Sequence, residues 1–195
     1  MKHPESFILL VLVLADHFLT LIGETQRVKK YSEHFTIEHY ELNPAWQESV
    51  AQKKWFDPKH ILLTITIIVL LMLVVESSYM PELFAQGLLG ALLVCFGSVV
   101  GRHLGNLLTF RHINRTPNEV SGQVSMTHAL LLSLSLYQLS GVLVPVALVA
   151  ALSPTPFAIG GVFGVVLLLI VHLQWIRKYR GVRKLINKPE VGASQ

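Results

Sequence analysis

Long apolar runs constrain this chain more than any other feature of its sequence. Five of them lie at residues 7–23, 60–75, 83–110, 124–152 and 156–176. A helix needs about 20 mostly apolar residues to cross the hydrocarbon core of a bilayer. Charged residues make up only 14% of the chain, whereas soluble domains carry roughly 25%. The sequence therefore predicts an all-α fold, a polytopic bundle of five transmembrane helices.

The positions of the basic residues predict how this bundle lies in a membrane. Fourteen of the sixteen Lys and Arg residues fall in three segments, at 24–59, at 111–123 and after residue 176. These segments share one side if all five runs cross, and cytoplasmic loops carry an excess of Lys and Arg. We therefore expect the N-terminus outside and the C-terminus in the cytoplasm, in the inner (cytoplasmic) membrane of a bacterium or archaeon.

The domain organisation follows from the same pattern. We expect one transmembrane domain over residues 1–188, with a cytoplasmic loop at 24–59, and a disordered tail at 189–195. The net charge of +4 does not indicate nucleic-acid binding, because the basic residues flank the spans and form no single soluble patch. The single cysteine excludes an intrachain disulfide.

The cytoplasmic loop carries weak signals for two short elements. Apolar and polar residues alternate loosely over 35–40, which favours a short extended piece. Asn43-Pro44 then indicates the start of a short helix over 45–56. We expect that helix at the membrane interface, with Trp46 at headgroup depth.

Polar and ionisable side chains gather at one depth inside the predicted spans. Each charged residue there costs about 2.5–3.5 kcal/mol on insertion scales. At a rise of 1.5 Å per residue, these groups lie roughly 6–12 Å from the cytoplasmic boundary. They come from four spans and are Asp16, His17, Arg102, His103, Asn106, His128 and His172. We expect Asp16 and Arg102 to form an ion pair, since pairing is the natural way to bury both.

Helical phase places several of these groups together. Asp16, His17 and Thr20 fall within one arc of the first span, and Arg102 and Asn106 share a face of the third. The alternative interpretation is that the histidines only reach the lipid headgroups and that Arg102 extends its side chain to the interface.

A stripe of small residues borders the Arg102 face of the third span. Glycines recur there every fourth residue, at Gly97, Gly101 and Gly105. Such stripes allow close contact between helices in membranes. We expect this face to pack against another helix, which leaves room for a homo-oligomer or a partner in a membrane complex.

Two short motifs resemble those of small integral-membrane proteins of bacteria and archaea whose function is unknown. Asp16-His17-Phe18-Leu19-Thr20 matches an Asp…Thr pair in their first span. Tyr40-Glu41-Leu42-Asn43-Pro44 matches a Glu-x-Asn-Pro motif that follows it. The Arg102-His103-x2-Asn106 stretch is also similar to such proteins. The resemblance implies their fold class and a functional pocket, but no activity.

These observations predict one ligand-binding pocket at the cytoplasmic leaflet. We expect it to be lined by the first, third and fourth spans and touched by the 41–44 segment, although Glu41 could be only a solvated charge and Asn43 only a helix cap. The predicted ligand-binding residues are Asp16, His17, Thr20, Glu41, Asn43, Arg102, His103, Asn106 and His128. No catalytic residue, cofactor or metal ligand is assigned.

Three functions stay open at this point. A membrane-lipid headgroup or small anion could bind or be translocated, because an arginine, histidines and a basic rim suit phosphate. The chain could instead be a non-catalytic scaffold or assembly subunit. An intramembrane metal-dependent enzyme is the third option, but no His-x3-His, His-x2-His-His or His-Glu-x2-His spacing is present. Walker, nucleophile-elbow and dinucleotide motifs are also absent, so enzymatic activity stays undecided.

Overall fold

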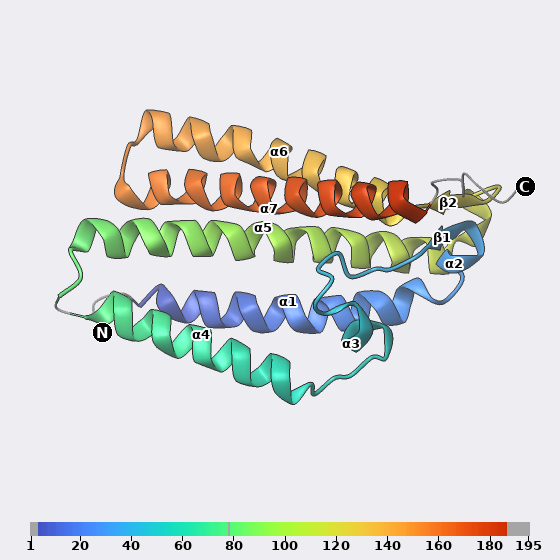
Figure 1. The fold of residues 1–195 in the computed structure, drawn as a ribbon, viewed down its shortest axis with the longest axis horizontal. Coiled ribbons are helices and arrows are strands. Elements are labelled where there is room, and N and C mark those ends of the chain that lie inside the picture. Colours follow the sequence, from blue (N-terminus) through green and yellow to red (C-terminus); the bar gives the residue numbers. More distant parts are fainter. Residues whose placement is uncertain (1–3, 78, 187–195) are drawn as a thin grey trace, which may run out of the picture.

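The computed structural model describes residues 4–77 and 79–186 and shows a bundle of long α-helices (Figure 1). The long helices of this part are α1 (Ser6–Arg27), α4 (Pro58–Glu76), α5 (Glu82–Arg115), α6 (His128–Leu152) and α7 (Pro156–Ile186). The short elements are α2 (Tyr31–His34), β1 (Phe35–Ile37), α3 (Gln47–Ala51), η1 (Pro117–Glu119) and β2 (Val124–Met126). Residues 1–3, 78 and 187–195 lie outside the described residues, and this set includes the predicted tail at 189–195.

Four of the long helices are long and apolar enough to cross a membrane. They are α1, α5, α6 and the first 26 residues of α7. The apolar stretch of α4, Thr64–Glu76, is shorter than a span usually requires. The structure therefore confirms an all-α bundle rich in candidate membrane spans, while the count of five spans and their orientation stay predictions.

The short elements gather at one end of the bundle. Figure 1 shows α2, α3, β1 and β2 where α1, α5 and α7 end and where α4 and α6 begin. The α4–α5 and α6–α7 connections lie at the opposite end. The two loops predicted to be cytoplasmic thus lie at the same end of the molecule.

The fourth span was predicted to begin at residue 124, which is four residues too early. Val124–Met126 is a strand that pairs in parallel with β1, with Phe35 opposite Val124. Helix α6 begins only at His128, after Thr127, whose side chain accepts a hydrogen bond from the backbone N–H of Leu130 at 3.3 Å. This is an N-cap interaction, and backbone pairing with β1 keeps the preceding residues extended.

The two short elements of the loop between α1 and α4 are both shorter than predicted. The extended piece expected over 35–40 is confirmed over Phe35–Ile37. The helix expected over 45–56 covers only Gln47–Ala51. Lys53, with φ 52°, adopts the left-handed conformation in which helices commonly end.

Helices α5 and α7 approach each other backbone to backbone. A methyl group on Gly160 would lie 1.9 Å from the carbonyl oxygen of Gly87, and one on Gly90 would lie 2.0 Å from that of Phe157. Only glycine fits at such contacts. Together with a similar approach at Gly164, they hold α7 against the first half of α5.

The glycine stripe predicted to pack against a helix has no such contact within the described chain. A methyl group on Gly97, Gly101 or Gly105 would meet no atom within 4 Å. These glycines border a hollow of about 570 Å³ between α5 and α6, whose other wall includes Gln138 and Val142. The prediction is wrong within this chain, because α7 presents its own glycines to an earlier part of α5.

Candidate functional site

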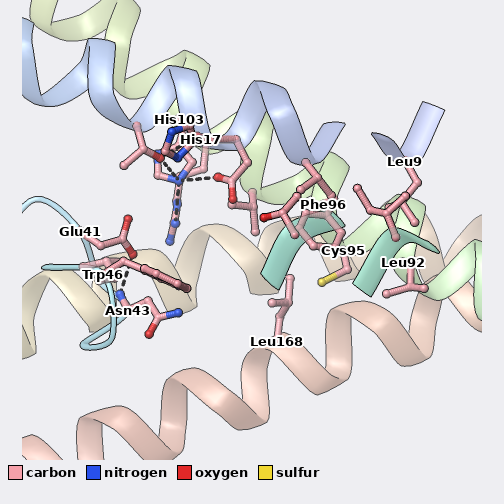
Figure 2. A pocket seen from close by; sticks show the side chains of 18 of the residues that line it. Leu9, His17, Glu41, Asn43, Trp46, Leu92, Cys95, Phe96, His103 and Leu168 are labelled. Carbon is pink, nitrogen blue, oxygen red and sulfur yellow. Dashed lines mark hydrogen bonds and ion pairs between the residues drawn. The ribbon is translucent and has the colours of Figure 1, made fainter. Parts of the chain in front are cut away.

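A cavity of about 710 Å³ lies between α1, α4, α5 and α7. The connection between α1 and α4 closes one end of it. Figure 2 shows His17, Glu41, Asn43 and His103 gathered at that end, whereas Leu92 and other apolar side chains lie further along. The cavity therefore has a polar end and an apolar arm.

The polarity gradient follows the sequence along single helix faces. Lining residues recur at intervals of three or four, the spacing that places side chains on one face of a helix. On α1 they are Leu9, Val13, Asp16 and Thr20, and on α5 they are Leu88, Leu92, Cys95, Val99 and Arg102. Each face is apolar where the helix begins and polar towards its C-terminal end.

His103 lies at the centre of the polar end and is only 4% exposed. Its Nε2 is 3.2 Å from Oδ1 of Asp16 and 3.3 Å from Oγ1 of Thr20. Its Nδ1 is 3.3 Å from the hydroxyl oxygen of Tyr40. Because both ring nitrogens have polar neighbours, the imidazole is held from both sides. This arrangement joins α1, α5 and the loop at one point.

The guanidinium of Arg102 lies next to His103 but forms no ion pair with a carboxylate of the described residues. One terminal nitrogen donates to the hydroxyl of Ser135, and the other lies 3.5 Å from Nε2 of His103. Its Nε–H is buried and has no hydrogen-bond acceptor in the part of the chain that the structure describes. Among the described residues the ion pairs of Asp and Glu involve other cations. The expected Asp16–Arg102 pair is thus replaced by Asp16–His103, with His103 lying between the two.

The loop residue Tyr40 rests on α1, and the next residue, Glu41, lines the polar end. The Tyr40 hydroxyl lies where a methyl group on Gly23 would be, only 2.5 Å from that position, so the absent side chain lets the loop rest directly on α1. Glu41 lines the cavity and accepts a hydrogen bond from the backbone N–H of Asn43 at 2.7 Å. Burial raises the pKa of the Glu41 carboxyl, and this hydrogen bond opposes the effect in part.

Asn43 combines two roles that the sequence left as alternatives. Its side-chain oxygen accepts from the backbone N–H of Ala45 at 3.1 Å, a local turn interaction. The residue also lines the cavity. Residues 41–43 therefore reach the polar end, as predicted.

Ser135 is a contact residue that the sequence analysis missed. It is 3% exposed and lies between Arg102 and His172, with its Oγ 3.0 Å from Nε2 of His172. The Nδ1 of His172 lies 2.9 Å from the carbonyl oxygen of Leu168, where it acts as the donor. The signal was present, because Ser135 follows His128 by seven residues and so lies on the same face of α6.

Two predicted site residues lie outside this cavity. Asn106 borders the second hollow, where Arg102 also contributes to the wall. His128 is buried, and its ring Nε2 lies 3.4 Å from the side-chain nitrogen of Gln47. Its backbone N–H donates to Glu38 at 3.2 Å. The other seven predicted residues line the cavity: Asp16, His17, Thr20, Glu41, Asn43, Arg102 and His103.

The walls of the cavity differ from the predicted ones. Helix α6 contributes no lining residue and acts only through Ser135 behind Arg102. Helices α4 and α7 supply walls instead, with residues such as Ile68 on α4 and Trp175 on α7. The apolar α4 residues carried no local signal that distinguishes a cavity wall from a lipid-facing surface.

The site offers hydrogen-bond donors but no evident metal centre. Within the described residues, no group of three or more His, Cys, Asp or Glu side chains is placed to hold a metal ion. A buried guanidinium with a free N–H favours a negatively charged group. The arrangement can therefore bind an anion next to the Asp16–His103 pair.

The comparisons with known proteins do not extend these observations. No protein-family model, curated protein or solved structure matches this chain. The resemblance of the Asp…Thr and Glu-x-Asn-Pro motifs to small membrane proteins stays a prediction.

Proposed function

We propose that this chain is a multi-pass protein of the inner (cytoplasmic) membrane that binds the anionic headgroup of a lipid, or a small anion, at the cytoplasmic leaflet. In this proposal all five long helices span the membrane, and the end with α2, α3 and the strands faces the cytoplasm. The polar end of the cavity then lies close to the lipid headgroups, and its apolar arm lies in the hydrocarbon region.

Arg102 is the observation that carries the proposal. A cation inside a membrane span is costly unless an anion or strong acceptors compensate it. The guanidinium of Arg102 contacts only Ser135 and His103, and its Nε–H has no acceptor among the described residues. Glu41 and Asp16 lie near enough to act on its charge but form no ion pair with it. An anionic ligand would supply both the missing charge and the missing acceptor.

The surroundings of the polar end suit a ligand from the membrane. Lys54 lines the cavity and adds a second positive charge. Trp46 and Trp175 also line it, and tryptophan is enriched at the level of lipid headgroups. The neighbouring cation Arg27 is already paired with Glu24 at 2.7 Å, which leaves Arg102 as the better candidate for the ligand.

The direct test compares Arg102→Gln with Arg111→Gln, a matched change on an exposed residue of the same helix. Thermal unfolding in a nonionic detergent would be measured against inorganic phosphate and butyl phosphate at constant ionic strength. We expect both anions to stabilise the wild type and Arg111→Gln, and the affinity of Arg102→Gln to fall at least about tenfold, the loss of one charge-assisted hydrogen bond. Equal stabilisation of all three proteins would refute an anion site at Arg102.

The orientation has its own test. In a Cys95→Ala background, single cysteines at Ser32 and Ser121 should react only from the cytoplasm, and those at Tyr79 and Ser153 only from outside. All four positions are exposed. If Ser32 and Tyr79 report the same side, α4 does not cross the membrane and the five-span topology fails.

A further inference from the structure

We infer that the cavity accommodates a single-chain anionic amphiphile, with its headgroup at Arg102 and its hydrocarbon chain in the apolar arm. This inference rests on the proposed anion site and specifies what is attached to the anion. The shared chemistry is one negatively charged head, a carboxylate or a monophosphate, on one unbranched or lightly branched chain.

The length of the apolar arm matches one lipid chain. On α5 the lining face extends from Arg102 back to Leu88, fourteen residues or about 21 Å at 1.5 Å per residue. On α4 it extends from Thr64 to Val74, about 15 Å on the same basis. One leaflet of a bilayer offers roughly 15 Å of hydrocarbon, half of its core thickness. A chain extending from Arg102 would therefore fill most of the arm.

The volume of the cavity suits one lipid chain better than two. If each non-hydrogen group occupies about 30 Å³, as a water molecule does in the liquid, 710 Å³ holds on the order of two dozen groups. A long-chain fatty acid or alkyl monophosphate has roughly twenty such groups, and a diacyl phospholipid about fifty. The single-chain class fits the space, and the two-chain class exceeds it.

The acidic residues at the polar end do not prevent an anionic head from binding. The Asp16 carboxylate faces His103, with Oδ1 3.2 Å from Nε2, and is therefore directed at the imidazole. Burial raises the pKa of Glu41, which favours the neutral carboxyl, a hydrogen-bond donor to an anion. The head would therefore meet the Arg102 guanidinium and an acid that is able to donate.

Helix α4 forms one long wall of the arm, and its two ends lie differently against the bundle. Its last residues are fixed, because Val75 is 1% exposed and packs with Ala85 and Leu89 of α5. Figure 1 shows its first turns diverging from α1, and Thr64 and Ile68 of that half line the cavity. The α4 wall is thus anchored to α5 at the end of the apolar arm, while its backbone diverges from that of α1 towards the polar end.

The test uses the native Cys95 as a reporter of chain occupancy. Cys95 lines the arm seven residues before Arg102, about 10 Å along the helix. Delipidated protein in a nonionic detergent would be titrated with octyl, dodecyl and hexadecyl carboxylates and with the matching alkyl monophosphates. Three compounds serve as comparisons. Hexadecanol has the chain without the charge, inorganic phosphate has the charge without a chain, and phosphatidic acid has two chains. The readouts are thermal unfolding and the rate at which N-ethylmaleimide modifies Cys95.

We expect affinity to rise by about fourfold per methylene until the arm is full. The dodecyl and hexadecyl anions should protect Cys95, whereas inorganic phosphate should bind without protecting it. The headgroup that binds more tightly, carboxylate or phosphate, identifies the class of lipid that the cavity accepts. Leu92→Trp, which fills the arm, should weaken hexadecyl binding at least tenfold and leave phosphate binding unchanged. Leu108→Trp, at an exposed position on the same helix, should alter neither. Partition of the amphiphiles into micelles is the same for the wild type and both variants, so it does not affect the comparison.

The outcomes separate this inference from the proposed function. If phosphate binds through Arg102 but hexadecyl anions neither protect Cys95 nor respond to Leu92→Trp, the anion site stands and the single-chain ligand is refuted. Tighter binding of phosphatidic acid than of hexadecyl phosphate also refutes it. If hexadecanol binds as well as the anions, or Arg102→Gln changes no affinity, the anion site itself fails. Cys95 protection needs no variant, so a misfolded Leu92→Trp protein leaves the test intact.

Discussion

The two halves of α5 use the same residue type in opposite ways. In the first half, Gly90 and its neighbours let the helix meet α7 so closely that no side chain fits between their backbones. In the second half, Gly101 and the glycines one turn to either side face open space. Small residues allow close packing, but a partner with complementary small residues decides where it happens.

The difference separates a half of α5 that packs directly on α7 from a half that carries the polar groups of the site. The glycine contacts fix α7 against α5 near the α6–α7 connection. Towards the other end the helices carry Arg102, His103 and His172, and hollows lie on both sides of Arg102. Tight packing in one half allows the other to hold polar groups without losing the fold.

The largest expected effect comes from filling the close contact between α5 and α7. Gly160→Val places side-chain atoms against the backbone of Gly87, which cannot move aside as a side chain would. We expect the free energy of unfolding to fall by about 3 kcal/mol or more, the upper range for overpacking. Unfolding in mixed micelles would measure it. Gly181→Val, on an exposed turn of the same helix with nothing within 4 Å, is the control, and equal stability of the two variants would show that the helices do not meet at Gly160.

The second prediction concerns the contact between Asp16 and His103, in the half of α5 that carries the polar groups. The 3.2 Å contact predicts that Asp16→Asn and His103→Gln are coupled. We expect an interaction energy of about 1 kcal/mol in a double-mutant cycle, kept small because the Asp16 side chain is 29% exposed. The parallel cycle with Arg102→Gln should show less coupling to Asp16. A larger value in that second cycle would restore the Asp16–Arg102 pair that the sequence suggested.

The sequence predicted which polar groups lie at one level of the bundle better than it predicted their partners. Apolar length and helix-start signals locate the helices, and the residue rise then places Asp16 and His103 at one level. Which of two adjacent residues, Arg102 or His103, faces Asp16 depends on a rotation of 100° between neighbours, and the packing of α7 sets that rotation. The pairing of β1 with β2 was also not predictable, because three-residue strands almost ninety positions apart leave no pattern.

A third prediction concerns pH and the wall of the polar end. A raised pKa means that the folded protein holds the proton of Glu41 more tightly than the unfolded chain does. Its stabilising contribution is therefore complete below the ordinary carboxyl value of 4.5 and is lost as pH rises through the raised pKa. We expect the wild type to lose stability over that window and Glu41→Gln to lose less. The other charged groups facing Glu41 are Asp16, Arg102 and His103.

Thermal unfolding of the two proteins from pH 4.5 to pH 8 measures this difference directly. His103→Gln in both backgrounds is the control for the neighbouring imidazole, because it changes both profiles equally if Glu41 acts alone. Parallel profiles for the wild type and Glu41→Gln would show that Glu41 ionises normally and is not shielded from water by the cavity.

The smallest expected effect is at Gly101, and it bears on the open face of α5. A methyl group there meets no atom within 4 Å, and alanine favours a helix over glycine by roughly 0.5–1 kcal/mol in water. Gly101→Ala should therefore leave the free energy of unfolding unchanged or raise it by up to about 0.5 kcal/mol. Measured at several protein concentrations, a clear loss of stability would mean that another helix occupies the hollow. Since the described chain supplies none there, that helix would come from a second copy or a membrane partner, as the glycine spacing predicts.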